Sequence, residues 1–179
     1  MKFTLPSPIQ KLLGILNVKL GPEVLPKSPI LLAVSLAAFA AAVFLFQWNY
    51  YSPARAAASG IGSAVLLAAV AMLWARLSGY NERLIQTLTA LALGGAVVIF
   101  VRTFLGLIIF ISPNLAELPE INVQQLVAFV LFPLYVWNIF VFAFLFRRSF
   151  RADLVVSFAI SIALVFCVYF SVPLAFKSL

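Results

Sequence analysis

The sequence predicts an all-α fold, a polytopic membrane helix bundle of five transmembrane helices with a short N-terminal amphipathic helix at the membrane interface. Hydrophobic residues make up 65% of the 179 residues and charged residues only 9%, whereas about a quarter of the residues in soluble domains are charged. The apolar residues form long uninterrupted runs, unlike the alternating pattern of barrel strands. Both observations indicate that lipid surrounds most of the chain.

Five apolar runs have the length of membrane-crossing helices, which need about 20 residues for a hydrocarbon core of about 30 Å. The third has two alternative ends, because the chain becomes apolar again after Arg102 and stays so to Ile111. We therefore expect a transmembrane domain over residues 30–176, after a cytoplasmic segment of residues 1–29. The predicted spans are residues 30–46, 56–75, 84–101 or 84–111, 123–146 and 154–172.

Basic residues are concentrated in alternate segments. The N-terminal segment, the loop after the second span and the loop after the fourth span hold nine of the 12 lysines and arginines. By the positive-inside rule these segments face the cytoplasm, which places the N-terminus in the cytoplasm and the C-terminus outside, in a bacterial inner membrane. Membrane lipids with anionic headgroups are the expected partners. Nucleic acid is not expected, because no loop is long enough for a binding domain.

Residues 8–20 predict an amphipathic helix. Ser7 and Pro8 resemble an N-cap and an N1 proline. We expect this helix to lie on the cytoplasmic membrane surface, with Lys11 and Lys19 near lipid phosphates. The alternative is that its apolar stripe docks on the transmembrane bundle or on a partner. The stripe consists of Ile9, Leu12, Leu13, Leu16 and Leu20.

Small residues mark two faces on which helices can approach each other closely. In the second span they recur every four residues, and the third span offers a matching surface. We expect the second and third spans to touch through these faces, either within one chain or between two copies. The faces consist of Ala56, Gly60, Ala64 and Ala68 in the second span and Ala90, Gly94 and Gly95 in the third.

Arg102 is the one charged residue that interrupts an apolar run, and an ionisable residue within a span is a candidate for function. Counted from Leu84 at a rise of ~1.5 Å per residue, it lies about 27 Å across the membrane, close to the outer interface. We expect its side chain to extend toward the outer headgroups or to pair with Glu117 or Glu120. The alternative is that it binds a substrate or lipid, or takes part in gating.

The fourth span contains Pro133 and Asn138. A proline inside a helix removes a backbone donor and is expected to kink the helix, and a buried asparagine needs a partner on a neighbouring helix. Either the two residues mark a cavity, or they are a bend and a polar packing contact.

Several chemistries lack the residues that they need. The chain has no histidine, and no aspartate or glutamate lies within a span, so neither a metal site nor a carboxylate proton relay can form in the membrane. The serines of the spans have no histidine base. We therefore expect no enzymatic activity and no cofactor.

Three stretches stand out: LPKSPILLAV before the first span, QTLTALALGGAV at the start of the third, and LYVWNIFVFAFLFRRSFRADLVVSFAISIAL across the fourth and fifth. With the five-span arrangement they resemble the bacterial members of the Yip family of Rab-interacting membrane proteins, over residues 26–172. The eukaryotic members bind prenylated GTPases through a longer N-terminal domain and carry an acidic-aromatic motif near the first span. This chain has neither, so the resemblance implies no GTPase binding.

Two functions are consistent with this pattern. The first is a non-enzymatic scaffold or accessory subunit, which contacts a membrane-protein partner or a second copy through the faces around Gly60, Ala64 and Gly94. The alternative is a small channel, transporter or lipid-handling protein with a site near Arg102, Pro133 and Asn138. The scaffold requires fewer special residues and is the favoured prediction.

Overall fold

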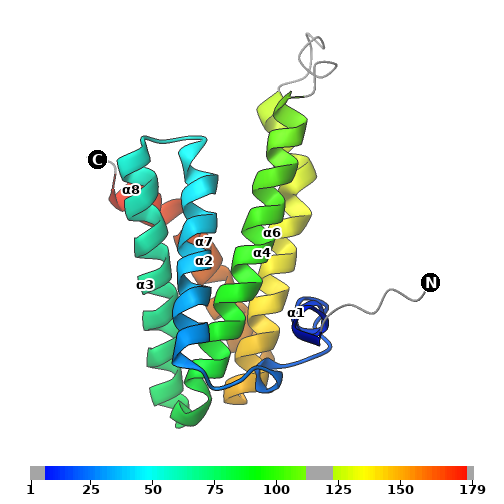
Figure 1. Cartoon of the computed structure of the whole chain (residues 1–179), viewed down its shortest axis with the longest axis vertical. Helices are drawn as coiled ribbons and strands as arrows, with labels where there is room; N and C mark the ends of the chain where they lie inside the picture. Colours follow the sequence, from blue (N-terminus) through cyan, green and yellow to red (C-terminus); the bar gives the residue numbers. More distant parts are fainter. Residues whose placement is uncertain (1–6, 112–122, 177–179) are drawn as a thin grey trace, which may run out of the picture.

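The computed structural model describes residues 7–111 and 123–176, and these form a bundle of helices (Figure 1). The described ranges contain no strand, which confirms the all-α prediction. Five of the described helical segments are long and apolar enough to cross a membrane. The elements are α1 (Ser7–Leu16), η1 (Pro22–Val24), α2 (Pro29–Trp48), α3 (Pro53–Ser78), η2 (Asn81–Arg83), α4 (Leu84–Ile111), α6 (Val123–Phe150), α7 (Leu154–Phe166), η3 (Cys167–Ser171) and α8 (Val172–Ala175).

Local start signals explain where α2 and α3 begin. The Ser28 side chain accepts a hydrogen bond from the backbone N–H of Leu31, and the Ser52 side chain accepts one from that of Arg55. A proline follows each serine at the first helical position. A serine N-cap satisfies an N–H that has no partner in the helix, and the fixed φ of proline suits the first turn.

The third span is one helix rather than two segments. α4 continues through Arg102 to Ile111, so the apolar stretch after the arginine belongs to the same helix. α4 and α6 each have 28 residues, which is ~42 Å of helix and more than the ~30 Å of a hydrocarbon core. The two helices lie side by side and extend past the upper ends of α2 and α3 (Figure 1).

The helices pack in an order that differs from their order in the chain. α2 contacts both α3 and α4, α4 packs on α6, and α6 packs on α7. Large aromatic side chains fill the space between them, among them Phe39 of α2 and Phe142 and Phe146 of α6, all fully buried. α3 packs mainly on α2 and also touches α4, α6, η3 and α8.

The small-residue faces meet partners other than the predicted ones. A Cβ atom on Gly60 would lie 2.5 Å from the backbone oxygen of Ala40, so this face of α3 packs on α2. A Cβ atom on Gly95 would lie 2.7 Å from the ring of Phe39, also in α2, and Gly94 faces α6. α3 and α4 do contact each other, as expected, but the atoms nearest to these three glycines belong to other elements. Small-residue spacing indicates a close approach without specifying which helix supplies the other side.

The amphipathic helix is shorter than predicted and is docked on the bundle. α1 ends at Leu16 because the chain turns at Val18, whose φ of 60° is in the left-handed region. Ile15 and Leu16 are buried and α1 packs against α4, whereas Ile9 and Leu13 are exposed. One side of the helix thus contacts the protein, and the other side is free to contact lipid. The helix therefore combines the two predicted alternatives, docking on the bundle and lying at the membrane surface.

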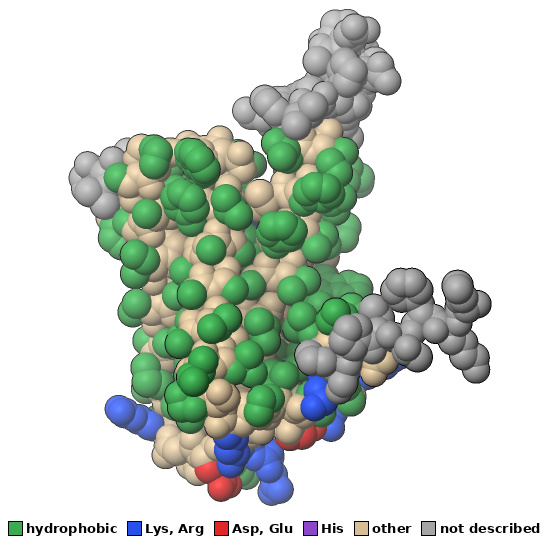
Figure 2. All heavy atoms as spheres, in the orientation of Figure 1, with side chains coloured by type: hydrophobic (Ala, Val, Ile, Leu, Met, Phe, Trp, Pro, Cys, Tyr) green, Lys and Arg blue, Asp and Glu red, His purple; other side chains and the backbone are tan. Residues whose placement is uncertain are grey.

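Charged side chains gather at one end of the molecule, the lower end in Figure 2. We call this the basic end. The turn from α3 to α4, the turn from α6 to α7 and the chain after α1 meet there, and Glu23 pairs with Arg148 across 2.6 Å. The arginines of this end are Arg76, Arg83, Arg147, Arg148 and Arg151.

Candidate functional site

Arg102 lies on α4 and points into the bundle. Only 8% of the residue is exposed. Its guanidinium carbon lies 3.9 Å from the ring centre of Tyr135, 4.1 Å from that of Phe46 and 4.8 Å from that of Tyr169. The expectation that this side chain extends toward the headgroups is therefore wrong, because this face of α4 is turned toward α2, α6 and η3.

The guanidinium has donors without acceptors. Nε and Nη1 of Arg102 are buried and form no hydrogen bond with any described residue. The described carboxylates, Glu23, Glu82 and Asp153, belong to η1, η2 and the turn before α7, at the basic end. The predicted partners Glu117 and Glu120 lie outside the described residues. Within the described chain, the positive charge is thus covered by rings instead of being paired with an acid.

Three aromatic rings from three elements surround this charge, and we call Phe46, Tyr135 and Tyr169 the ring cluster. Tyr169 stands edge-on to Tyr135 at 4.7 Å and to Phe46 at 5.6 Å between ring centres. A desolvated cation over a ring gains about 2 kcal/mol or more. A buried donor without a partner costs about 1–3 kcal/mol, and more when it is charged. The rings therefore offset part of the cost of burying the charge, but they leave Nε and Nη1 without acceptors.

Tyr169 reaches the cluster from a widened helical turn. η3 is a π-helix, in which the backbone N–H of Val172 donates to the oxygen of Cys167, five residues earlier. Pro173 explains the widening, because a proline cannot donate to the carbonyl four residues before it, here that of Tyr169, and its ring crowds that carbonyl. Single π-turns of this kind are frequent at functional sites.

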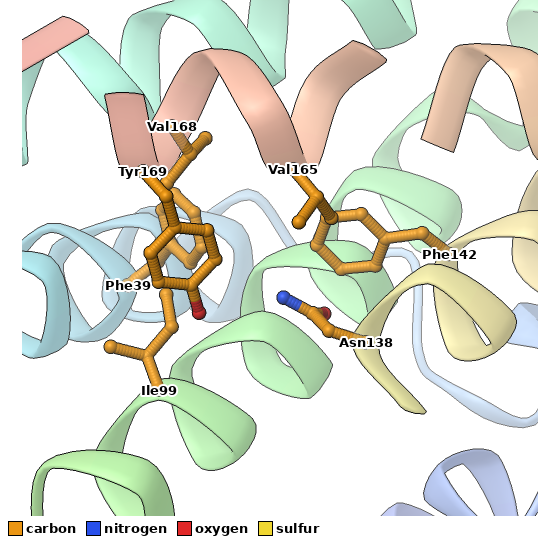
Figure 3. A pocket seen from close by; sticks show the side chains of 7 residues that line it. All are labelled: Phe39, Ile99, Asn138, Phe142, Val165, Val168 and Tyr169. Atoms are coloured by element: carbon orange, nitrogen blue, oxygen red, sulfur yellow. The ribbon is translucent and has the colours of Figure 1, made fainter. Parts of the chain in front are cut away.

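Asn138 lies beside the ring cluster, one helical turn from Tyr135 toward the basic end. Only 2% of it is exposed, and its Oδ1 and the hydroxyl of Tyr169 have no hydrogen-bond partner among the described residues. Figure 3 shows the Tyr169 hydroxyl and the Asn138 amide pointing toward each other across a small void. The void is too small to hold a water molecule, and its other lining residues are Phe39, Ile99, Phe142, Val165 and Val168.

Pro133 does not belong to this site. It is exposed on the outside of α6, and the helix continues through it. Pro133 and Asn138 are five residues apart, or about 140° around a helix, so they cannot face the same cavity. The two residues therefore do not mark one cavity together, and of the two only Asn138 lines the small void.

The remaining predicted residues lie elsewhere. Gly60 and Gly94 are buried in helix contacts, and Ala64 is partly buried on the face of α3 that carries Gly60. Lys11 and Lys19 are exposed on and just after α1. The structure therefore brings Arg102 and Asn138 together through Tyr169 and separates them from the other candidates.

The ring cluster was not predicted. Tyr135 and Tyr169 are the only tyrosines in the fourth and fifth predicted spans. Tyrosines are usual at membrane interfaces but carry a hydroxyl that needs a partner when it is buried. The single tyrosine in each of these spans therefore marks Tyr135 and Tyr169 as candidate site residues. Nothing in their spacing links them to Arg102.

Comparisons with protein families, with curated proteins and with solved structures found no match to this chain. Its function therefore has to be inferred from the site itself.

Proposed function

We propose that the protein is an integral membrane protein that binds an anionic ligand at Arg102, without a chemical step. The observation that carries this proposal is a buried guanidinium with unpaired N–H donors inside a membrane span. A charge in this position is costly, and such residues are commonly retained for a ligand or an ion pathway. A phosphate or carboxylate group would pair with the charge and accept hydrogen bonds from it.

The arrangement favours a binding pocket over a pore. The unpaired polar groups run from Arg102 to Tyr169 and Asn138 and do not continue through the next turns of α6. The next buried side chains of α6 toward the basic end are apolar, and they include Phe142, Leu145 and Phe146. A conducting path needs polar groups or water along its whole length, whereas a ligand site can be closed at one side.

The test is ligand-dependent stabilisation of the purified protein in detergent. A ligand at 100 times its Kd raises the free energy of unfolding by about 2.7 kcal/mol, so we expect a higher Tm with at least one of three probes: inorganic phosphate, succinate or dioleoylphosphatidylglycerol. Arg102→Gln is expected to remove this increase, and Arg76→Gln, at an exposed position of the basic end, is expected to keep it. An increase that persists in Arg102→Gln would contradict the proposal.

We further propose that the basic end faces the cytoplasm, as the positive-inside rule predicts. Topology reporters after Ser78 and Ser149, both near turns of this end, should then give cytoplasmic signals. Reporters after Pro53 and Pro119 and at the C-terminus should not. A cytoplasmic signal at Pro53 would show that the protein has the opposite orientation. Different signals at Ser78 and Ser149 would show that these two turns lie on opposite sides of the membrane, which would contradict the arrangement of the helices.

The scaffold function and the Yip-family resemblance stay predictions. The face around Gly60 was the main surface offered for a partner, and α2 covers it within the same chain. The site at Arg102 is thus the stronger basis for a function.

A further inference from the structure

We propose that Tyr80, Arg83 and Arg151 form a binding site for a phospholipid with two phosphates, such as cardiolipin, in the leaflet at the basic end. This site uses none of the residues around Arg102, so it is independent of the proposed function. Two guanidiniums that meet at one aromatic ring, without a partner among the described residues, carry the inference. They come from different turns of the bundle, and a ligand that contacts both joins these turns.

The backbone after α3 fixes the position of the Tyr80 ring. Gly79 ends α3 in the left-handed region, with a φ of 77°, and its N–H donates to the oxygen of Arg76. The N–H of Tyr80 donates to the oxygen of Ala75, five residues earlier, at 3.1 Å. These two bonds form a Schellman motif, in which the residue after the glycine commonly packs an apolar side chain against the helix. The Tyr80 side chain accordingly packs against the hydrophobic core.

Two arginines from different turns meet at this ring. Arg83 belongs to η2, between α3 and α4, and Arg151 follows the end of α6. The guanidinium carbon of each lies 5.8 Å from the centre of the Tyr80 ring. Within the described ranges, neither guanidinium forms a hydrogen bond or an ion pair, and the acid of Glu23 pairs with Arg148 instead. The donors of both side chains are thus available to a ligand.

The acids closest in the sequence do not neutralise this pair. Glu82 precedes Arg83, and Asp153 follows two residues after Arg151. Neither acid forms an ion pair with a described residue, and the Asp153 carboxylate accepts a hydrogen bond from the N–H of Val155 in the first turn of α7. Two positive charges therefore remain side by side. Two phosphates joined by one glycerol carry the matching negative charges and accept charged hydrogen bonds from arginine.

Arg151 has an unusual backbone conformation. Its φ of 50° is in the left-handed region, which favours glycine over residues with a side chain. Strained residues cluster at sites that clamp a ligand, so an arginine at such a position supports a binding role for its side chain. Replacement by glycine removes the guanidinium and relieves the backbone at the same time.

The pair lies at the level of the lipid headgroups. Leu77 is three residues before Tyr80, in the last turn of α3, and Leu154 is three residues after Arg151, in the first turn of α7. Both leucines are exposed. The change from apolar to basic side chains within one turn marks the edge of the hydrocarbon core. Basic pockets between membrane helices at this level bind phospholipid headgroups, cardiolipin among them.

The experiment measures binding to the purified protein by native mass spectrometry with three probes. Tetraoleoyl cardiolipin has two phosphates and acyl chains, dioleoylphosphatidylglycerol has one phosphate, and pyrophosphate has two phosphates but no chains. We expect one cardiolipin to bind at least about tenfold more tightly than either comparison compound, because only cardiolipin combines a second charged hydrogen bond with apolar chains.

Two variants each remove one member of the pair. Arg83→Gln and Arg151→Gly are each expected to weaken cardiolipin binding about tenfold, because each removes one charged contact. Arg151→Gly should do so without lowering the Tm, since glycine suits the backbone at this position. If Arg83→Gln cannot be purified in a folded state, Arg151→Gly decides.

The matched control is Arg147→Gln, which removes the same charge from the same end. Arg147 is exposed in the last turn of α6 and contacts no described ring or acid. A single exposed charge contributes little, so cardiolipin binding should weaken by about twofold or less.

Three results would overturn the inference. Pyrophosphate that binds as tightly as cardiolipin would show that the site takes a soluble anion. Phosphatidylglycerol that binds as tightly would show that one phosphate is enough. Cardiolipin binding that is unchanged in Arg83→Gln and Arg151→Gly, or is weakened as much in Arg147→Gln, would show that the lipid responds only to the general charge of the basic end.

Discussion

Gly60→Leu is expected to prevent α2 and α3 from packing and to lower the free energy of unfolding by more than about 3 kcal/mol. Even a Cβ atom at this position would lie 2.5 Å from the backbone oxygen of Ala40, and a backbone atom cannot move aside as a flexible side chain can. Overpacking in a close-packed interior costs about 1–3 kcal/mol, and more where nothing can shift. Thermal unfolding followed by circular dichroism would measure the loss, and size-exclusion chromatography would detect aggregation.

Ala57→Leu is the matched control, because Ala57 is exposed one turn earlier in α3. Leucine is nearly as good a helix former as alanine, so this variant should unfold close to the Tm of the unchanged protein. Gly60→Ala should fall between the two variants. A Tm of Gly60→Leu within about 2 °C of the unchanged protein would show that α2 and α3 are not in backbone contact.

Arg102→Met is expected to raise the stability of the ligand-free protein, by about 1 kcal/mol, while it abolishes ligand binding. The substitution loses the attraction between the guanidinium and the ring cluster, about 2 kcal/mol for a desolvated cation over a ring. It also removes the desolvation cost of a buried charge, several kcal/mol, together with the cost of its unpaired donors. Apolar replacement of buried charges is often neutral or stabilising for this reason.

Arg55→Met is the comparison variant, and it is expected to lower the free energy of unfolding instead of raising it. Its guanidinium donates to the Pro173 oxygen and stacks on Tyr51, so the variant loses a satisfied hydrogen bond and should be less stable. Both variants are to be unfolded in detergent without added lipid, so that the unchanged protein is also free of ligand. A loss of more than about 2 kcal/mol in Arg102→Met would mean that the arginine mainly ties the helices together, and the binding proposal would lose its basis.

The fold class could be predicted because the hydropathy of a span is a local property. The third span shows what local patterns leave open. The sequence left its end open between residues 101 and 111. The depth of Arg102 can be estimated by counting residues, but the direction of its side chain depends on which face of α4 meets the bundle. Apart from Thr103, the residues around Arg102 are apolar, so no polar face marks the lipid-facing or the buried side of the helix.

The contacts of the site could not be predicted, because they depend on how distant spans pack. Gly60 was correctly expected at a close contact, but its spacing could not identify α2 as the partner. Tyr169 lies in a π-turn, which changes the direction of the side chains that follow. Pro173 indicates that one backbone hydrogen bond is missing there, but it does not indicate that the turn widens. Pro133 was wrongly grouped with Asn138 for a related reason. A proline indicates that one backbone hydrogen bond is missing, but it does not indicate which face of the helix the proline occupies.

The ring cluster has a consequence for the synthesis of the protein. Arg102 emerges from the ribosome after Phe46 but before Tyr135 and Tyr169, so the third span enters the membrane when its arginine has one of its three rings. The other two arrive only with the fourth and fifth spans. Until then the cheapest position for the guanidinium is at the water interface, and all three rings are in place around it only when the last span has been inserted. Completion of the site is thereby coupled to completion of the chain.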